Sequence, residues 1–358
     1  MKRIMHVVGA RPNFMKASPV LGALSDHSSV DQTLVHTGQH YDLNMSDIFF
    51  DELSMPLPDF NLGVGSGSHA DQTAGIMKKL DALLAENRPD LVVVYGDVNS
   101  TVASSLVCSK LGIPVGHVEA GLRSFDRRMP EELNRLVTDQ LSDHLFTPST
   151  DAKINLIKEG IHEERIYEVG NVMIDSLVKL REVAAERRVL ERQLEGFEEY
   201  GLVTVHRPSN VDEPGYFECL LNCLNGISKH IPLVFPVHPR TKASIDQFPL
   251  NTSHLIMTGP LGYLDFLALQ MRAKLVITDS GGIQEETTYL GIPCLTIRDN
   301  TERPVTVTSG TNILVGRDLD KLTSEVESIL SGNVKEGSIP PLWDGKASVR
   351  IAAILENV

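Results

Sequence analysis

The chain has 358 residues, and its 33 Lys and Arg residues against 47 Asp and Glu residues give a formal net charge of −14. Such an excess of negative charge repels phosphate backbones and anionic headgroups, which argues against a nucleic-acid-binding or membrane-surface protein. The length and the hydrophobic content of 42% predict a globular protein of two domains. We expect neither a membrane span nor a signal peptide, because no sufficiently long apolar run is present. The four cysteines form no CxxC pair, so we expect buried, reduced thiols and a cytoplasmic location.

Short aliphatic and β-branched runs alternate with helical patterns along the whole chain. The expected strands are 4–8, 33–36, 91–95, 115–118, 166–169, 202–205, 233–237, 255–257, 275–278 and 294–297. The clearest helical patterns are 69–86, 100–111, 131–141, 216–230 and 263–271. Because these strands are continuously apolar, both faces of their sheets should be covered by helices. The alternation of such strands with helices predicts parallel α/β sheets.

Two such sets of elements follow one another. A helix that starts at Met173 leads into a charged stretch, and a new set of strands opens at Gly201. We expect Rossmann-like domains over residues 1–170 and 171–340, with parallel sheets facing a central cleft, and a last helix over residues 341–358. Ligands of open parallel sheets bind beyond the carboxyl ends of the strands, so polar residues there are the site candidates.

Carboxylates follow strand ends in the first half of the chain. Glu119 comes directly after the expected strand 115–118, and Asp97 comes two residues after the end of 91–95. Glu131 and Glu132 open the helix that follows. Only one of the two adjacent glutamates can face the same site. Clustered carboxylates shift each other's pKa values and can divide acid and base roles, so Asp97, Glu119 and Glu131 indicate proton transfer. The alternatives are a helix cap at Asp97 and a first-turn charge at Glu131.

The turn after the first strand, residues 9–16, reads GARPNFMK. Arg11 and Lys16 flank the start of the next helix, and a helix N-terminus with cations is a site for an anion. A plain turn with two solvated cations is the alternative. The pattern is not GxGxxG, so it does not support dinucleotide binding.

The second half of the chain carries different chemistry. Ser280–Gly282 form a strand-to-helix turn whose backbone N–H groups can cradle a pyrophosphate, and Glu286 lies one helical turn further, where it can accept hydrogen bonds from a ribose diol. His206 and His238 follow neighbouring strands, and Arg303 adds a cation near the same edge. A structural role is the alternative for the two histidines.

Taken together and in this order, the motifs resemble the non-hydrolysing UDP-N-acetylglucosamine 2-epimerases over essentially the whole chain. Each motif alone is weak, whereas the ordered set is specific. The motifs are Gly9-Ala10-Arg11-Pro12 with Lys16, Gly96-Asp97, His117-Val118-Glu119-Ala120-Gly121-Leu122-Arg123, Pro130-Glu131-Glu132 with Asn134-Arg135, Asp279-Ser280-Gly281-Gly282 with Gln284-Glu285-Glu286, and Thr301-Glu302-Arg303-Pro304.

The resemblance implies a GT-B fold that binds a UDP-sugar in its cleft, a C-terminal helix that returns to the first domain, a homodimer, and no metal or other cofactor. The reaction it implies is the interconversion of UDP-GlcNAc and UDP-ManNAc, by elimination and re-addition of UDP through a 2-acetamidoglucal. The catalytic residues it implies are Asp97, Glu119, Glu131 and His206, and which carboxylate removes the proton stays open. The substrate-binding residues it implies are Arg11, Lys16, Arg135, His238, Ser280, Gly281, Gly282, Glu286 and Arg303.

Two departures from the family's pattern concern the substrate. Residues 61–68 lack the arginine that relatives activated by their own substrate carry, so we expect a hyperbolic rate curve. The loop from Glu119 to Glu131 is as short as in relatives that epimerise UDP-2,3-diacetamido-glucuronate. Arg127 or Arg128 could meet the C6 carboxylate of that substrate, and a solvated basic pair is the alternative.

A GT-B glycosyltransferase is the candidate function of another class. Such an enzyme would not need three convergent carboxylates.

Overall fold

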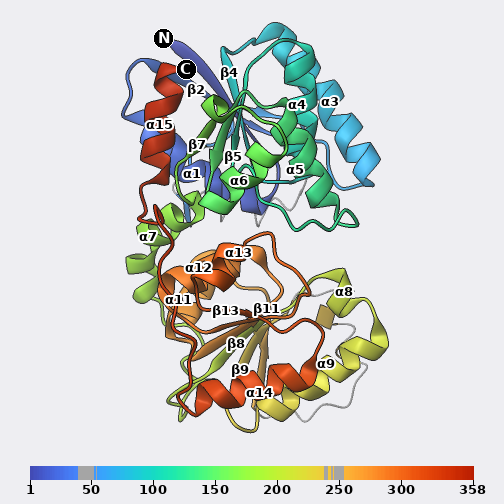
Figure 1. The fold of residues 1–358 in the computed structure, drawn as a ribbon, viewed down its shortest axis with the longest axis vertical. Coiled ribbons are helices and arrows are strands. Elements are labelled where there is room, and N and C mark those ends of the chain that lie inside the picture. Colours follow the sequence, from blue (N-terminus) through green and yellow to red (C-terminus); the bar gives the residue numbers. More distant parts are fainter. Residues whose placement is uncertain (39–51, 54, 238–240, 243–244, 246–253) are drawn as a thin grey trace. The chain divides into compact units, whose positions relative to one another are not determined.

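The computed structural model describes residues 1–38, 52–53, 55–237, 241–242, 245 and 254–358. The chain divides into two compact units, each of which is a parallel sheet with helices packed on it (Figure 1). Unit 1 comprises Met1–Lys179 and Pro341–Val358, and unit 2 comprises Leu180–Pro340. The predicted α/β class with two parallel sheets is therefore confirmed.

Unit 1 contains a 7-stranded sheet in the order β3-β2-β1-β4-β5-β6-β7, in which every pairing is parallel. Its strands are β1 (Lys2–Val8), β2 (Val30–His36), β3 (Phe60–Asn61), β4 (Leu91–Tyr95), β5 (Val115–Val118), β6 (His144–Thr147) and β7 (Ile166–Glu168). Strand β4 is buried along its whole length, as expected for an apolar strand with helices on both faces.

Helices cover both faces of this sheet. In Figure 1, α3, α4 and α5 lie on one side of the sheet, and α1 and α15 lie on the other. The described helices of unit 1 are α1 (Arg11–Ser25), α3 (His69–Glu86), α4 (Asn99–Lys110), α5 (Pro130–Leu141), α6 (Thr150–Lys158) and α15 (Ala347–Asn357). Helix α7 (Val172–Ala185) begins in unit 1 and ends in unit 2.

Unit 2 contains a 6-stranded sheet in the order β10-β9-β8-β11-β12-β13, again parallel throughout. Its strands are β8 (Gly201–Thr204), β9 (Leu233–Pro236), β10 (Leu255–Thr258), β11 (Leu275–Thr278), β12 (Cys294–Thr296) and β13 (Asn312–Leu314). Its described helices are α8 (Pro208–Val211), α9 (Pro214–Ile227), α11 (Tyr263–Arg272), α12 (Gly281–Leu290), α13 (Pro304–Thr308) and α14 (Leu319–Leu330). Helices α9 and α14 lie on one side of the sheet, and α11, α12 and α13 lie on the other (Figure 1).

The last segment of the chain packs within unit 1. The indole N–H of Trp343 donates to the carbonyl oxygen of Pro148 at 2.9 Å. The carboxylate of Asp175 accepts from the backbone N–H groups of Ala347 and Ser348 at 3.1 and 2.6 Å, so it caps the N-terminus of α15. The last helix begins at Ala347 and not at residue 341, because the loop before it is occupied in packing the indole.

The structure corrects the sequence-based expectation in several places. Strands β3, β6 and β13 were not expected, because runs of two to four residues (FN, HLFT and NIL) carry too little apolar periodicity to stand out. The expectation of buried thiols holds for Cys108 and Cys294 but is wrong for Cys219, which is exposed, while Cys223 is partly exposed. No helix in the described ranges combines the length and the apolar character needed to cross a membrane.

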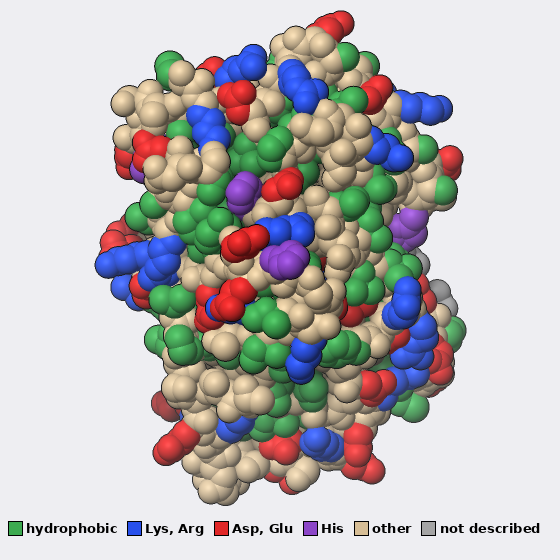
Figure 2. Space-filling view, turned by 45° about the horizontal axis from the view of Figure 1, so that its top comes forward, with side chains coloured by type: hydrophobic (Ala, Val, Ile, Leu, Met, Phe, Trp, Pro, Cys, Tyr) green, Lys and Arg blue, Asp and Glu red, His purple; other side chains and the backbone are tan. Residues whose placement is uncertain are grey.

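On the face shown in Figure 2, acidic and basic side chains are interspersed over most of the described surface.

Candidate active site

In unit 1, β1 and β4 are neighbours at the point where the strand order reverses, and such points hold the ligands of open parallel sheets. Gly96 follows β4 with φ of +63°. A Cβ at this position would lie 2.8 Å from Nζ of Lys16 and 3.2 Å from Oε2 of Glu119. Glycine is therefore required, because it lets the Lys16 and Glu119 side chains lie directly against the backbone of the turn.

Glu119 follows β5 and lies in the left-handed region with φ of +74°. Its Oε2 is ion-paired to Nζ of Lys16 from α1, and both side chains are about nine-tenths buried or more. A non-glycine residue in this conformation costs on the order of 1 kcal/mol, and such strain is concentrated at active sites. The ion pair and the strained backbone together hold the Glu119 carboxylate in one position beside Gly96.

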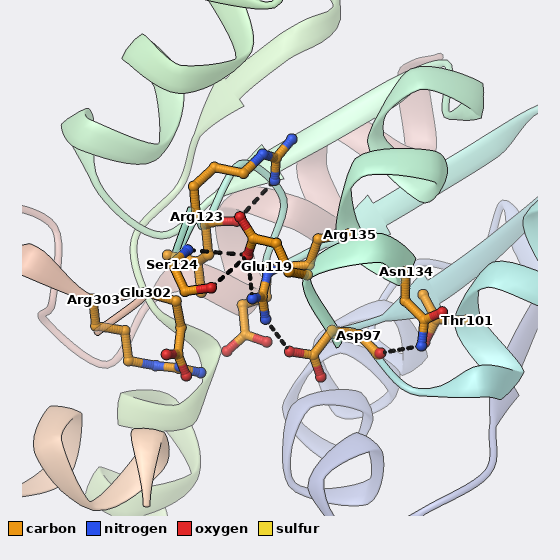
Figure 3. Close-up of polar contacts among 12 residues, drawn as sticks. Asp97, Thr101, Glu119, Arg123, Ser124, Asn134, Arg135, Glu302 and Arg303 are labelled. Atoms are coloured by element: carbon orange, nitrogen blue, oxygen red, sulfur yellow. Dashed lines mark hydrogen bonds and ion pairs between the residues drawn. The ribbon is translucent and has the colours of Figure 1, made fainter. Parts of the chain in front are cut away.

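Asp97 is held by helix α5. The guanidinium of Arg135 donates to its Oδ2, and Nδ2 of Asn134 donates to its backbone oxygen at 2.8 Å (Figure 3). The side chain of Arg135 is almost fully buried, whereas 23% of the Asp97 side chain is exposed. Asp97 thus has a fixed carboxylate with one side open to solvent or to a ligand.

The two adjacent glutamates at the start of α5 have different surroundings. Glu132 is buried and accepts from the backbone N–H groups of Ser124 and Phe125 at 3.0 and 2.9 Å, and it also pairs with Arg135. Burial would raise the pKa of Glu132, but Arg135 and these N–H groups bring it below its usual value. Glu132 therefore fixes the loop between β5 and α5, while Glu131 remains partly exposed.

In unit 2, Asp279 at the end of β11 organises the neighbouring strand end. Its fully buried carboxylate accepts from the backbone N–H groups of His206 and Arg207 at 3.0 and 2.8 Å and from Nδ2 of Asn210 at 3.0 Å. Nδ1 of His206 lies 2.9 Å from Oδ1 of Asp279, while 58% of the His206 side chain is exposed. The burial of Asp279 opposes its ionisation, but His206 and the N–H groups lower its pKa below the usual range. The pair orients an exposed imidazole, as a carboxylate does in many catalytic histidines.

Helix α12 starts directly after Ser280, whose side chain makes no capping hydrogen bond to the first turn. A Cβ at Gly281 would lie 2.5 Å from Nη1 of Arg303 and 2.7 Å from Oε1 of Glu302. Only glycine fits against these two side chains. Gly282 is the next residue of the helix, so the turn has the backbone character expected of an anion cradle.

The cations at this edge of unit 2 are paired with carboxylates. Arg303 is buried, with Nε 2.8 Å from Glu285 Oε1 and Nη1 bonded to Glu302. Nη2 of Arg298 donates to the other Glu302 oxygen at 2.6 Å. Arg303, which the sequence predicts as a cation near this edge, is thus part of a buried network of ion pairs.

Several residues of the site have bonding partners that the sequence did not indicate. The Glu286 carboxylate is buried, and its Oε1 accepts from the hydroxyl of Tyr263 at 2.9 Å. The partners Asp279, Glu285 and Glu302 were missed as functional candidates. The sequence signal that could have indicated them is position, since Asp279 directly follows the strand β11 and Glu285 lies in the first turns of the helix opened by Gly281.

The structure says less about the remaining residues that the sequence predicts for the site. Arg11 is the first residue of α1, and its side chain is not described. His238 lies outside the described residues. Arg127 is exposed, and the guanidinium of Arg128, with 88% of the side chain exposed, donates to both oxygens of Asp126 at 2.8 Å. Among the residues that the structure describes, no cluster of three or more His, Cys, Asp or Glu side chains has the arrangement of a metal site.

Comparison with known proteins adds to this geometry. Residues 22–356 match the family model of UDP-N-acetylglucosamine 2-epimerase. The UDP-N-acetylglucosamine 2-epimerase of Methanocaldococcus jannaschii is 44% identical over 362 residues, which are 98% of this chain and 97% of that protein. A crystal structure of the M. jannaschii enzyme in complex with UDP-GlcNAc and UDP has a TM-score of 0.91 and 42% identity, covering 99% of both chains. The UDP-2,3-diacetamido-2,3-dideoxy-D-glucuronate 2-epimerase of Pseudomonas aeruginosa is 41% identical over 99% of this chain and 100% of its own length.

Proposed function

The chain belongs to the UDP-N-acetylglucosamine 2-epimerase family, and we propose that it interconverts UDP-GlcNAc and UDP-ManNAc. The observation that carries this proposal is the pair of carboxylates Asp97 and Glu119 at the switch point of unit 1, each held by a buried cation. Fixed carboxylates at a ligand-binding edge supply the acid and base groups that an epimerase needs.

The chemistry follows from the position of the proton. C2 of the sugar is not next to a carbonyl group, so its proton is weakly acidic. When a carboxylate takes this proton, the C–H electron pair forms the C1=C2 double bond, and the C1–O electron pair leaves with UDP. A proton delivered to the opposite face of C2, with return of UDP to C1, completes the inversion. The steps balance without an oxidant or a reductant.

We assign the proton transfers to Asp97, Glu119 and Glu131. The ion pairs with Lys16 and Arg135 support this assignment, because they orient the carboxylates of Glu119 and Asp97 in a largely buried setting. Glu131 is the free member of its pair, since Glu132 is occupied by the loop. One carboxylate takes the C2 proton, and another returns a proton on the opposite face.

Unit 2 is assigned to UDP. The glycine turn that opens α12 supports this assignment, because its backbone N–H groups can hold the diphosphate. Glu286 would then accept from the ribose hydroxyls, and His206, oriented by Asp279, would face the reacting sugar. The further substrate-binding residues proposed are Arg11, Lys16, Arg135, His238, Ser280, Gly281, Gly282 and Arg303.

Incubation with UDP-GlcNAc in D2O tests the proposal directly. We expect NMR to show deuterium at C2 and both epimers at equilibrium, because the proton returned to C2 comes from solvent. A glycosyltransferase would show no exchange and would consume the sugar nucleotide only when an acceptor is added. That result would overturn the epimerase assignment.

A second candidate substrate is UDP-2,3-diacetamido-glucuronate. It is favoured by the 41% identity to the P. aeruginosa enzyme and by the exposed Arg128 on the short loop between β5 and α5. Exchange at C2 with this substrate and not with UDP-GlcNAc would select it. In that case Arg128→Ala should raise KM for the uronate, because the contact to its C6 carboxylate would be lost, and should leave kcat nearly unchanged. With either substrate we expect a hyperbolic rate curve, and a strongly sigmoidal one would contradict this expectation.

We also propose a homodimer formed through the α3–α5 face of unit 1. Leu133 and Val137 on α5 are 42% and 40% exposed, and a neighbouring cavity of about 420 Å³ is lined by residues of α3 and α5. Under a two-fold axis, this one surface would supply both the apolar ridge and the groove that receives it. Light scattering should give a dimer mass, and the double variant Leu133→Lys, Val137→Lys should give a monomer. An unchanged mass would exclude this face.

A cytoplasmic location completes the proposal. All four cysteines are free thiols in the structure, which suits a reducing compartment. Fractionation of the native host should place the protein with soluble cytoplasmic markers.

A further inference from the structure

His117 on β5 is fully buried and is hydrogen-bonded through both ring nitrogens. Nδ1 lies 2.6 Å from Oδ1 of Asp139 on α5, and Nε2 lies 2.8 Å from the carbonyl oxygen of Gly96. Both partners are oxygen acceptors if Asp139 is ionised, whereas a neutral imidazole has only one N–H to donate. The geometry therefore requires either a second proton on the ring or a proton on Asp139.

The surroundings of Asp139 decide between these two arrangements. Its Oδ2 lies 2.7 Å from Nη1 of Arg123 and accepts from the backbone N–H of Gly121 at 3.1 Å. These donors favour the carboxylate form. With Asp139 ionised, the second proton belongs to His117.

The charges around this histidine form an alternating series. Arg123 is also bonded to Glu159, with Nε 2.8 Å from one carboxylate oxygen and Nη2 2.6 Å from the other. The series Glu159, Arg123, Asp139 and protonated His117 sums to zero, which is how charges are tolerated in a protein interior. On the side of Gly96 where a Cβ would point lie the charged groups of Lys16 and Glu119, and Asp97 is the next residue of the chain.

The ring nitrogen Nε2 holds the turn at the centre of the carboxylate site. Gly96 donates its own N–H to the backbone oxygen of Val118 at 2.9 Å, so both polar groups of this residue are bound to β5. The Cα of Gly96 faces the Lys16–Glu119 pair, and the next residue is Asp97. A shift of Gly96 would therefore displace both carboxylates.

We propose that His117 is a buried imidazolium that serves as a positioning residue, fixing the Gly96–Asp97 turn and through it the carboxylates of Asp97 and Glu119. The positioning role rests on the proposed function, whereas the charge of the ring does not. The two parts have separate tests.

The charge is tested by NMR of protein labelled with ¹⁵N-histidine, with the His117 signals assigned by their loss in His117→Gln. At neutral pH we expect protons on both ring nitrogens of His117. A ring nitrogen with the chemical shift of an unprotonated site would overturn the proposal. Because this measurement needs neither substrate nor turnover, it stands even if the enzyme acts on another sugar nucleotide.

The positioning role is tested by the kinetics of His117→Gln. The amide can still donate to Gly96, but it carries no charge and cannot bridge both acceptors. We expect kcat to fall about 10- to 100-fold, as for a displacement near 1 Å of reacting groups, while KM changes less than about threefold. His144→Gln, a matched change on β6 of the same sheet, should keep the wild-type kcat.

Affinity for UDP is measured on the same variants by calorimetry. His117→Gln should retain it, since UDP is assigned to unit 2. A wild-type kcat in this variant, or a loss of UDP affinity equal to the loss of kcat, would overturn the positioning role. Wild-type protein that bound no UDP and exchanged no C2 proton would instead refute the proposed function.

Discussion

The switch-point edges of the two units are built on the same topology but carry opposite charge arrangements. In unit 1, buried cations from α1 and α5 hold two carboxylates, the buried Glu119 with its strained backbone and the partly exposed Asp97. In unit 2, the cation Arg303 is buried between carboxylates, and the open elements are a helix N-terminus and an oriented imidazole. The first arrangement suits proton transfer, and the second suits binding of an anion.

This contrast shows that the Rossmann-like sheet sets where a site lies and not what it does. Parallel strands bring their carboxyl ends to one edge, and the residues directly after them determine the chemistry. Variants on the two edges should therefore separate turnover from UDP affinity.

The largest effect is expected for Asp97→Asn in unit 1. The amide cannot take or return a proton, so turnover should fall at least about 100-fold, the lower range for loss of an acid–base group. UDP affinity measured by calorimetry should stay unchanged. Asp81→Asn, an exposed position on α3, serves as the control. Near-normal turnover in Asp97→Asn would remove Asp97 from the mechanism.

The adjacent pair Glu131 and Glu132 should separate catalysis from stability. Glu131→Gln should lower turnover about 100-fold and leave the unfolding free energy within about 0.5 kcal/mol of wild type. Glu132→Gln should lower the unfolding free energy by about 1–3 kcal/mol, because its acceptor contacts with Ser124 and Phe125 are buried. Urea unfolding and initial rates measure the two effects. The reverse pattern would exchange the roles of the two glutamates.

In unit 2, Gly281→Ala should weaken UDP binding about tenfold, equal to about 1.4 kcal/mol. The new methyl group would lie too close to Arg303 and Glu302 and would displace the turn. Gly215→Ala near the start of α9 meets no atom within 4 Å and should bind UDP normally. Unchanged UDP affinity in Gly281→Ala would exclude this turn as the diphosphate cradle.

The smallest expected effect is on acid stability, and it involves both units. The pKa values of Asp139 and Asp279 are lowered from 3.8, so the folded state binds protons there less readily than the unfolded chain. Their stabilisation is present above the unfolded pKa and is lost as the pH falls through the folded values. Asp139→Asn or Asp279→Asn should therefore flatten the loss of stability below about pH 4.

Asp151 is the matched control for this acid effect. Burial raises its pKa, so its contribution has the opposite sign and is present at low pH. Asp151→Asn should consequently make the acid slope steeper. Urea unfolding at several pH values between about 2 and 6 measures all three variants, and equal slopes would contradict the assignment.

Much of the fold could be predicted because its signal is local. The expected strands 91–95, 115–118 and 275–278 agree with β4, β5 and β11 residue for residue, since a continuous apolar run marks a strand buried on both faces. The strand ends then indicated Asp97 and Glu119 as candidates. The short strands β3, β6 and β13 escaped, because their neighbours in the sheet, and not their own sequences, stabilise them.

The sequence by itself determined the class of the fold, the strand ends that carry polar residues and the family. Only the tertiary structure decided which partner each of those residues has. Lys16 and Glu119 are paired although they are 103 positions apart in the sequence, and His206 and Asp279 are paired although they are 73 positions apart. Contacts between residues distant in the sequence also fix Glu132, and not Glu131, against the loop before α5. The same holds for the pairing of Arg303 with Glu285. Apolar periodicity is a property of neighbouring residues, whereas an ion pair depends on how distant strand ends and helices meet in space.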